Sequence, residues 1–152
     1  MRSTCPFITW IPVGFAFMTS LVAAPVGAQE GHVALMPDQV QWRDFSLAAG
    51  VKVAALYGAP DQKSLYTLRV KMEDGAKLHI HTHPDTRMIT VLSGKLIAGK
   101  GARYDTANET AFPAGGFFVV PAGMPHYTRA GDGEVLYQEN GLGPSPTILL
   151  SQ

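Results

Sequence analysis

The chain has 152 residues, of which 12 are basic and 12 acidic, and it contains one cysteine. This balanced charge, without a basic run, argues against nucleic acid or an anionic membrane surface as a partner and favours a small-molecule ligand. We expect a chain of this length to form one domain.

Residues 1–28 have the pattern of a secretory signal peptide. Arg2 precedes an apolar run over residues 7–24, and the small residues 26–28 form a candidate cleavage site before Gln29. A membrane anchor is the alternative reading, although prolines interrupt the run. We expect a secreted or periplasmic protein with no membrane segment after cleavage. Its single domain would cover residues 29–152 and contain no cysteine, because Cys5 lies in the signal.

Short strands follow along the rest of the chain. The clearest covers residues 65–72, where Tyr66, Leu68, Val70 and Met72 alternate with polar side chains. Further strands are predicted over residues 40–45, 51–57, 78–83, 87–93, 96–98, 117–120, 126–130 and 134–138. Residues 99–115 read as a glycine-rich connection and residues 141–146 as a turn or extended tail. Without any 3.6-residue apolar period, this pattern predicts an all-β antiparallel sandwich or barrel.

Three histidines stand where one divalent metal could bind them. His81 and His83 are two residues apart on a predicted strand, so their side chains point the same way, about 6.6 Å apart. His126 follows a buried apolar strand and a turn and opens the next strand. A lone histidine on an apolar face is usually a core residue, but three at this spacing favour a divalent transition metal such as Fe, Mn, Zn, Ni or Cu.

The two stretches that carry these histidines resemble the paired motifs of the cupin superfamily. The matching positions are Gly75, five residues, His81-x-His83 and Gly94, then Gly115, five residues, Pro121-x-Gly123-x-x-His126. The resemblance covers roughly residues 60–140. It implies one antiparallel β-barrel of the jelly-roll type, with the metal held inside. Two positions depart from the family pattern, because Arg87 replaces the usual glutamate and Ala130 an asparagine that is often present.

Strand alternation also places His79 on the face of His81 and His83, one pleat deeper in the barrel. His79 could therefore be a fourth ligand. The interpretation we favour is a hydrogen-bonding partner of the ligands or a contact to the substrate, since metal-bound imidazoles need such partners.

Arg87 creates an electrostatic problem, since a guanidinium cannot bind a cation. At about 6 Å from a divalent ion and an effective dielectric near 20, the repulsion would be roughly 5 kcal/mol. Three arrangements resolve it: an anion bridges the metal and Arg87, the side chain turns toward Asp85 or another carboxylate, or no metal binds. We favour the first over a plain salt bridge with Asp85, which makes Arg87 the anchor of an anionic substrate.

The sequence favours an enzyme over a binding protein. A three-histidine site without a carboxylate resembles the site of some cupin dioxygenases, so Fe(II)-dependent oxidation of a small anionic molecule is the leading hypothesis. The alternatives are metal-dependent lyase, isomerase or decarboxylase chemistry, or a non-catalytic periplasmic binding module. The resemblance also implies a candidate homodimer that forms through an edge strand.

The signal-peptide interpretation predicts that the mature protein begins at Gln29. Intact-mass measurement of protein from the periplasm or the medium tests it. Protein from that fraction that still carries residues 1–28 would show that the segment is an anchor.

Overall fold

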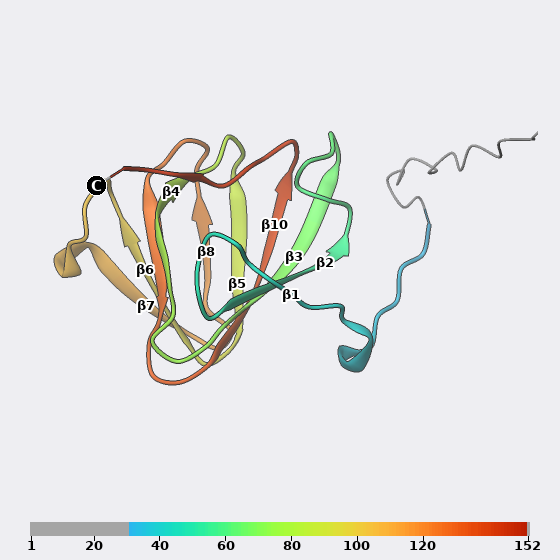
Figure 1. Ribbon diagram of the computed structural model, residues 1–152, viewed down its shortest axis with the longest axis horizontal. Helices are drawn as coiled ribbons and strands as arrows, with labels where there is room; N and C mark the ends of the chain where they lie inside the picture. The colour runs from blue at the N-terminus through green and yellow to red at the C-terminus, as the bar shows by residue number, and fades with distance from the viewer. Residues whose placement is uncertain (1–30, 152) are drawn as a thin grey trace, which may run out of the picture.

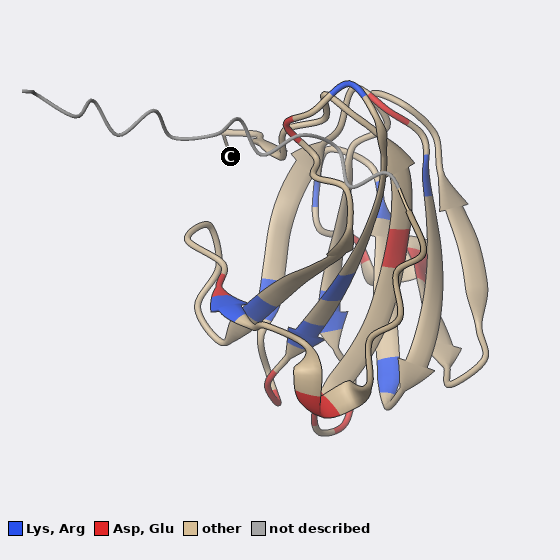
Figure 2. Ribbon diagram, turned by 90° about the vertical axis from the view of Figure 1, so that its right-hand side faces the viewer, with Lys and Arg blue, Asp and Glu red and all other residues tan. Residues whose placement is uncertain are grey.

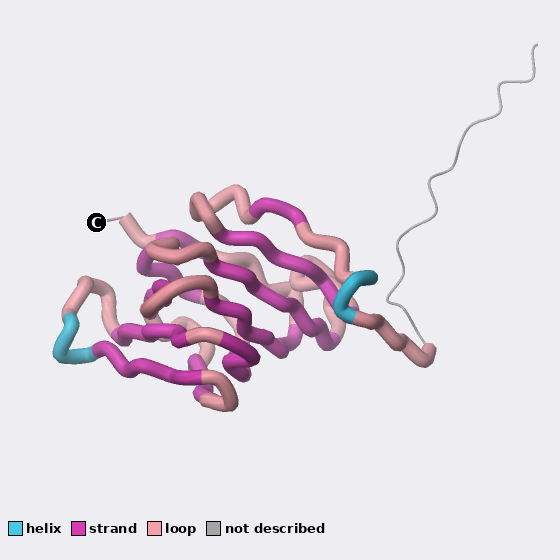
Figure 3. The backbone as a smooth tube through the Cα atoms, turned by 90° about the horizontal axis from the view of Figure 1, so that it is seen from below, coloured by secondary structure: helices cyan, strands magenta, loops and turns pink. Residues whose placement is uncertain are grey.

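The computed structural model describes residues 31–151, and the predicted signal peptide lies outside the described residues. Two short 3-10 helices, η1 Pro37–Gln39 and η2 Thr106–Asn108, are the helical segments of the described part, and Figure 3 shows that strands make up most of the rest. Over residues 31–151, no helix is long and apolar enough to span a bilayer.

The strands form two antiparallel sheets, as the sequence predicts for a jelly roll. One sheet has six strands in the order β1-β2-β3-β10-β5-β8 and the other has five in the order β11-β4-β9-β6-β7. Figure 1 shows β2, β3 and β10 at one side of the molecule and β6 and β7 at the other. The bounds are β1 Arg43–Asp44, β2 Val51–Tyr57, β3 Leu65–Met72, β4 Lys77–Thr82, β5 Arg87–Ser93, β6 Lys95–Lys100, β7 Glu109–Pro113, β8 Phe117–Val120, β9 His126–Ala130, β10 Val135–Leu142 and β11 Ile148–Leu149.

The core lies between the two sheets and follows from the period-two alternation of their strands. In β3 every second side chain is buried from Tyr66 to Met72, and in β10 every second residue from Val135 to Gly141. Basic and acidic residues are spread over strands and turns of both sheets (Figure 2). Most inward positions are apolar, so the few buried polar residues at such positions, such as Glu139, are candidates for the functional site.

Three segments differ from the sequence-based expectation. The strand predicted over residues 40–45 is only the two-residue β1, which follows η1. Residues 99–115 contain η2 and β7, residues 141–142 of the predicted tail belong to β10, and β11 follows that tail. Both missed strands lie at the ends of their sheet, and β11 is exposed, as is most of β7. An edge strand that buries little surface needs no apolar alternation, so the sequence pattern gave no signal.

The pairing of β6 with β9 depends on a glycine. Gly99 lies directly opposite Tyr127, and a Cβ at Gly99 would overlap the Cζ and Oη atoms of that tyrosine. Tyr127 is 2% exposed, and its hydroxyl oxygen lies 3.1 Å from the backbone nitrogen of Asp105, which donates to it. Gly99 therefore lets the tyrosine lie across β6 and hold the loop that contains η2.

We predict that Gly99→Ala lowers the free energy of unfolding by about 1–3 kcal/mol, because the added methyl displaces a buried ring. In a Tyr127→Leu background the cost should fall below about 1 kcal/mol, since the obstructing ring is absent. Urea unfolding of the four proteins of this double-mutant cycle measures both costs. An equal cost in the two backgrounds would contradict the steric explanation.

Candidate metal centre

A β-bulge in β4 decides which of its side chains face the interior. Leu78 pairs with Thr128 of β9 but His81 pairs with His126, so β4 has two residues between these pairs where β9 has one. Strict alternation would put Leu78 and His81 on opposite faces, whereas both are buried. The bulge therefore turns His81 inward, directly across from His126.

The same bulge places His79 outside, so the expectation that it shares the inner face is wrong. Its imidazole is exposed, and its Nδ1 lies 2.7 Å from the hydroxyl oxygen of Tyr104. What His79 does contribute is its backbone carbonyl, which lies 2.6 Å from Nδ1 of His81. Because any residue has a carbonyl, the identity of this side chain does not matter for that contact.

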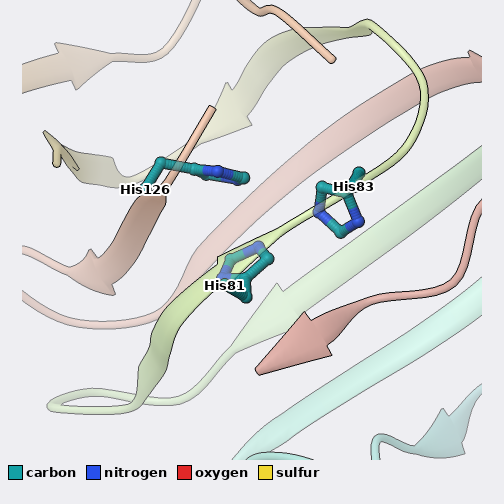
Figure 4. A group of neighbouring side chains, drawn as sticks. All are labelled: His81, His83 and His126. Atoms are coloured by element: carbon teal, nitrogen blue, oxygen red, sulfur yellow. The ribbon is translucent and has the colours of Figure 1, made fainter. Parts of the chain in front are cut away.

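The structure brings His81, His83 and His126 together in the interior, as Figure 4 shows. Their exposed fractions are 1%, 2% and 4%. The ring centroids of His81 and His126 are 4.1 Å apart, and the centroid of His83 lies 4.7 Å from the first and 5.3 Å from the second. One ring nitrogen of each histidine lies within 4.8 Å of those of the other two. Small side-chain adjustments would therefore let all three nitrogens bind one ion.

Each of the three imidazoles uses Nδ1 to contact a backbone carbonyl. The acceptors are His79 for His81 at 2.6 Å, Met124 for His126 at 3.0 Å and Pro146 for His83 at 3.3 Å. A carbonyl only accepts, so Nδ1 carries the proton and the lone pair remains on Nε2. Backbone acceptors on the far nitrogen are the usual way of orienting a metal-binding histidine, so this donor set fits a divalent transition metal.

The protein environment keeps these imidazoles neutral. Burial lowers the pKa of His81 to about 3 and that of His83 to about 2, and burial also lowers the pKa of His126. The positive charge of Arg87 also lowers the pKa of all three imidazoles. Because the neutral form is the one that binds metal, no proton needs to leave at neutral pH.

Arg87 points inward but is neutralised by two carboxylates. Its Nη1 donates to Oε2 of Glu139 at 2.8 Å, and its Nε lies 3.4 Å from Oδ1 of Asp85. Its Nη2 donates to the carbonyl and the hydroxyl of Ser145, at 3.1 Å and 3.3 Å. Of the three arrangements considered from the sequence, the structure shows the one in which Arg87 turns toward carboxylates. Each of its three nitrogens already has an acceptor in the protein, which leaves the role of anion anchor unsupported.

The carboxylates of this network have further partners. Asp85 accepts hydrogen bonds from the hydroxyl of Tyr66 at 2.7 Å, from the backbone nitrogen of Leu142 at 3.1 Å and from the hydroxyl of Ser145. Glu139 has Arg87 as its polar partner, and burial raises the pKa of its carboxyl while the guanidinium opposes that rise. Burial therefore disfavours the ionised form of Glu139.

A cavity of about 650 Å³ adjoins this network between the sheets. Arg87, Glu139 and Ser145 give it a polar end. Most of the remaining wall is apolar and includes Phe45, Val53, Leu68, Leu78 and Tyr137. Pro146 also lines the cavity, and its carbonyl contacts His83, so one short segment connects the cavity to the histidines. This volume suits an organic molecule of moderate size.

Sequence reasoning missed the contribution of the C-terminal segment. The sequence pattern indicates only a turn or extended tail over residues 141–146, yet Ser145 contacts Arg87 and Pro146 contacts His83. The contact to His83 and one of the two contacts to Arg87 use backbone carbonyls, which leave no sequence signal. Glu139 continues the inward alternation of Val135 and Tyr137 in β10, one residue beyond the strand predicted over residues 134–138.

Comparison with solved structures finds the same fold in proteins of low sequence identity. The polyketide cyclase RemF from Streptomyces resistomycificus is 15% identical, with a TM-score of 0.69 over 80% of this chain and 87% of that one. An RmlC-like cupin from Shewanella frigidimarina NCIMB 400 is 20% identical, with a TM-score of 0.61 over 77% and 96%. The DMSP lyase DddQ from Ruegeria pomeroyi DSS-3 is 22% identical, with a TM-score of 0.59 over 72% and 60%. No curated protein matches the sequence.

The chain also matches the model of one protein family. The model of the ChrR cupin-like domain matches residues 30–142, which is well over half of the chain and includes all three buried histidines. The jelly-roll sheets and the two histidine motifs agree with this match. The chain belongs to the ChrR cupin-like family of the cupin superfamily.

Proposed function

We propose that this protein is a metal-dependent enzyme in which His81, His83 and His126 hold one divalent transition metal beside a cavity for a small molecule. The observation that carries the proposal is the shared orientation of the three imidazoles, each with Nδ1 on a carbonyl and Nε2 free. A metal bound there supplies Lewis acidity or, as Fe(II), oxidation by dioxygen. The proposal includes a secreted or periplasmic location.

Oxidation by an Fe(II)-type dioxygenase is the reaction we put first. Three neutral imidazoles without a carboxylate ligand would leave the full positive charge on a bound metal, and three protein ligands would leave it able to bind small reactants. Similar folds named as a polyketide cyclase and a DMSP lyase support a small-molecule substrate and keep lyase or isomerase chemistry as the alternative.

The cavity favours a substrate with a largely apolar body and one polar group. Its walls are mainly aliphatic and aromatic, and its polar end holds Arg87 and Glu139 as a hydrogen-bonded pair. An anionic substrate group, the sequence-based expectation, would have to take the place of Glu139 on the guanidinium. Glu139 is buried with a raised pKa and lines the cavity, so it is the candidate to hold or accept a proton from the substrate.

The charge balance of the Arg87 network is compatible with a nearby cation. Arg87 contributes one positive charge, while Asp85 and Glu139 contribute two negative charges when both are ionised. The repulsion of roughly 5 kcal/mol that an unpaired guanidinium would exert on the ion is therefore offset within the protein. No bridging anion is needed for the metal to bind.

A non-catalytic binding module is the second candidate. One observation favours it: the lining of the 650 Å³ cavity includes none of the three buried histidines. A ligand could occupy such a cavity without touching a bound metal.

We predict that His81→Ala, His83→Ala and His126→Ala each lower metal occupancy at least about tenfold, because two imidazoles make an incomplete chelate. His79→Ala is the matched control, since it removes an exposed imidazole of the same strand and keeps the carbonyl that contacts His81. Elemental analysis of proteins purified without added metal, and again after anaerobic loading with Fe(II), gives the occupancies. Equal metal content in all variants and the parent would eliminate these histidines as ligands.

Measurements on the parent protein distinguish oxidation from the alternative functions. Oxygen-electrode measurements with small acids, thiols and diketones should show metal-dependent oxygen uptake if the protein is a dioxygenase. Retained metal without uptake would replace oxidation by lyase or isomerase chemistry. Absence of metal together with ligand-dependent thermal stabilisation would establish the binding module.

We predict that Arg87→Leu lowers the free energy of unfolding by about 3–5 kcal/mol at neutral pH, because Asp85 and Glu139 lose their buried cation. Adding Glu139→Gln removes one of the two unpaired charges and should restore part of this loss. Arg103→Leu, at an exposed position, should change stability by less than about 0.5 kcal/mol. Urea unfolding measures all four proteins. If Arg87→Leu were as stable as Arg103→Leu, Arg87 would not be held in the network.

A further inference from the structure

A second cavity, of about 190 Å³, includes His126 in its wall. It lies where the exposed ends of the two sheets meet, between β7 and β8, and it shares no lining residue with the larger cavity. Across this junction Phe112 of β7 stacks on Phe118 of β8, with the ring centroids 4.4 Å apart. One histidine of the cluster, His126, therefore borders a small cavity that is separate from the larger one.

The composition of the wall limits what this cavity can take. Apart from His126, its buried and half-buried side chains are apolar, namely Ala98, Phe112, Phe118, Val120 and Met124. Lys100 and Thr110 also line it, and both are exposed. Beyond these two side chains and His126, the side chains of the wall are apolar. Apolar cavities of about 150 Å³ take up xenon or small apolar molecules.

The size of the cavity excludes the class of ligand that fits the larger one. Drug-sized organic ligands occupy pockets of roughly 300–1,000 Å³, so a cavity of 190 Å³ has room only for a much smaller molecule. We propose that the 190 Å³ cavity binds dioxygen and delivers it to the histidine cluster, while the organic substrate uses the 650 Å³ cavity. This inference rests on the proposed oxidation. It adds the route of the second reactant and the residues that form it.

Ala98→Leu tests the inference, because Ala98 lines the cavity and a larger side chain there would fill it. Ala111→Leu is the matched control. It makes the same change at an exposed position of β7, between two residues that line the cavity, but Ala111 itself is not part of the wall. If Ala98→Leu does not fold, Ala98→Val adds fewer atoms and should give an intermediate effect.

Two probes provide the measurements. Crystals of the metal-free protein under xenon pressure should show xenon beside His126 in the parent and in Ala111→Leu, and none in Ala98→Leu. Stopped-flow mixing of nitric oxide with the Fe(II)-loaded proteins should show a reaction slowed at least about tenfold in Ala98→Leu alone. Absence of xenon from this cavity in the parent, or equal nitric oxide rates in Ala98→Leu and Ala111→Leu, would overturn the proposal.

Failure of the proposed function would look different. A protein that retains no metal, or takes up no oxygen with any substrate, fails in elemental analysis and at the oxygen electrode. Xenon occupancy in the metal-free protein is independent of both and decides whether the cavity accepts an apolar gas.

Discussion

Burying three imidazoles side by side is the constraint on which the rest of the structure depends. Each ring must remain neutral and have its N–H satisfied, and in this protein three backbone carbonyls meet the second requirement. One carbonyl belongs to the bulged part of β4, one to the turn before β9 and one to the C-terminal segment. The site is therefore assembled from parts of the chain that come together only when the barrel is complete.

The C-terminal segment connects the separate features of the interior. The backbone of Leu142 donates to Asp85, Ser145 contacts Arg87, and the carbonyl of Pro146 contacts His83. Residues 144–147 also line the larger cavity. A ligand in that cavity would touch the same segment that orients His83, so this segment physically connects the larger cavity with the proposed metal site.

The parts of the site that follow from side-chain pattern could be predicted from the sequence. Spacing identified His81, His83 and His126, and alternation gave the long strands that carry the core. Alternation was wrong for His79, because a bulge shifts the pattern by one residue and leaves no mark in local sequence. The sequence analysis already offered Asp85, two positions away, as a partner of Arg87. The contacts of Arg87 to Glu139 and Ser145 could not be predicted, since these residues lie more than 50 positions away in the chain. Interactions across such separations depend on topology and register.

X-ray absorption spectroscopy at the metal edge of the Fe(II)-loaded protein tests the central claim most directly, because it counts the imidazoles around the ion. The account predicts three imidazole nitrogens at about 2.1 Å in the parent and in His79→Ala. His126→Ala, if it retains any metal, should show two. A spectrum of the parent with no imidazole ligand, or one unchanged by His126→Ala, would contradict the assignment of His81, His83 and His126 as the metal site.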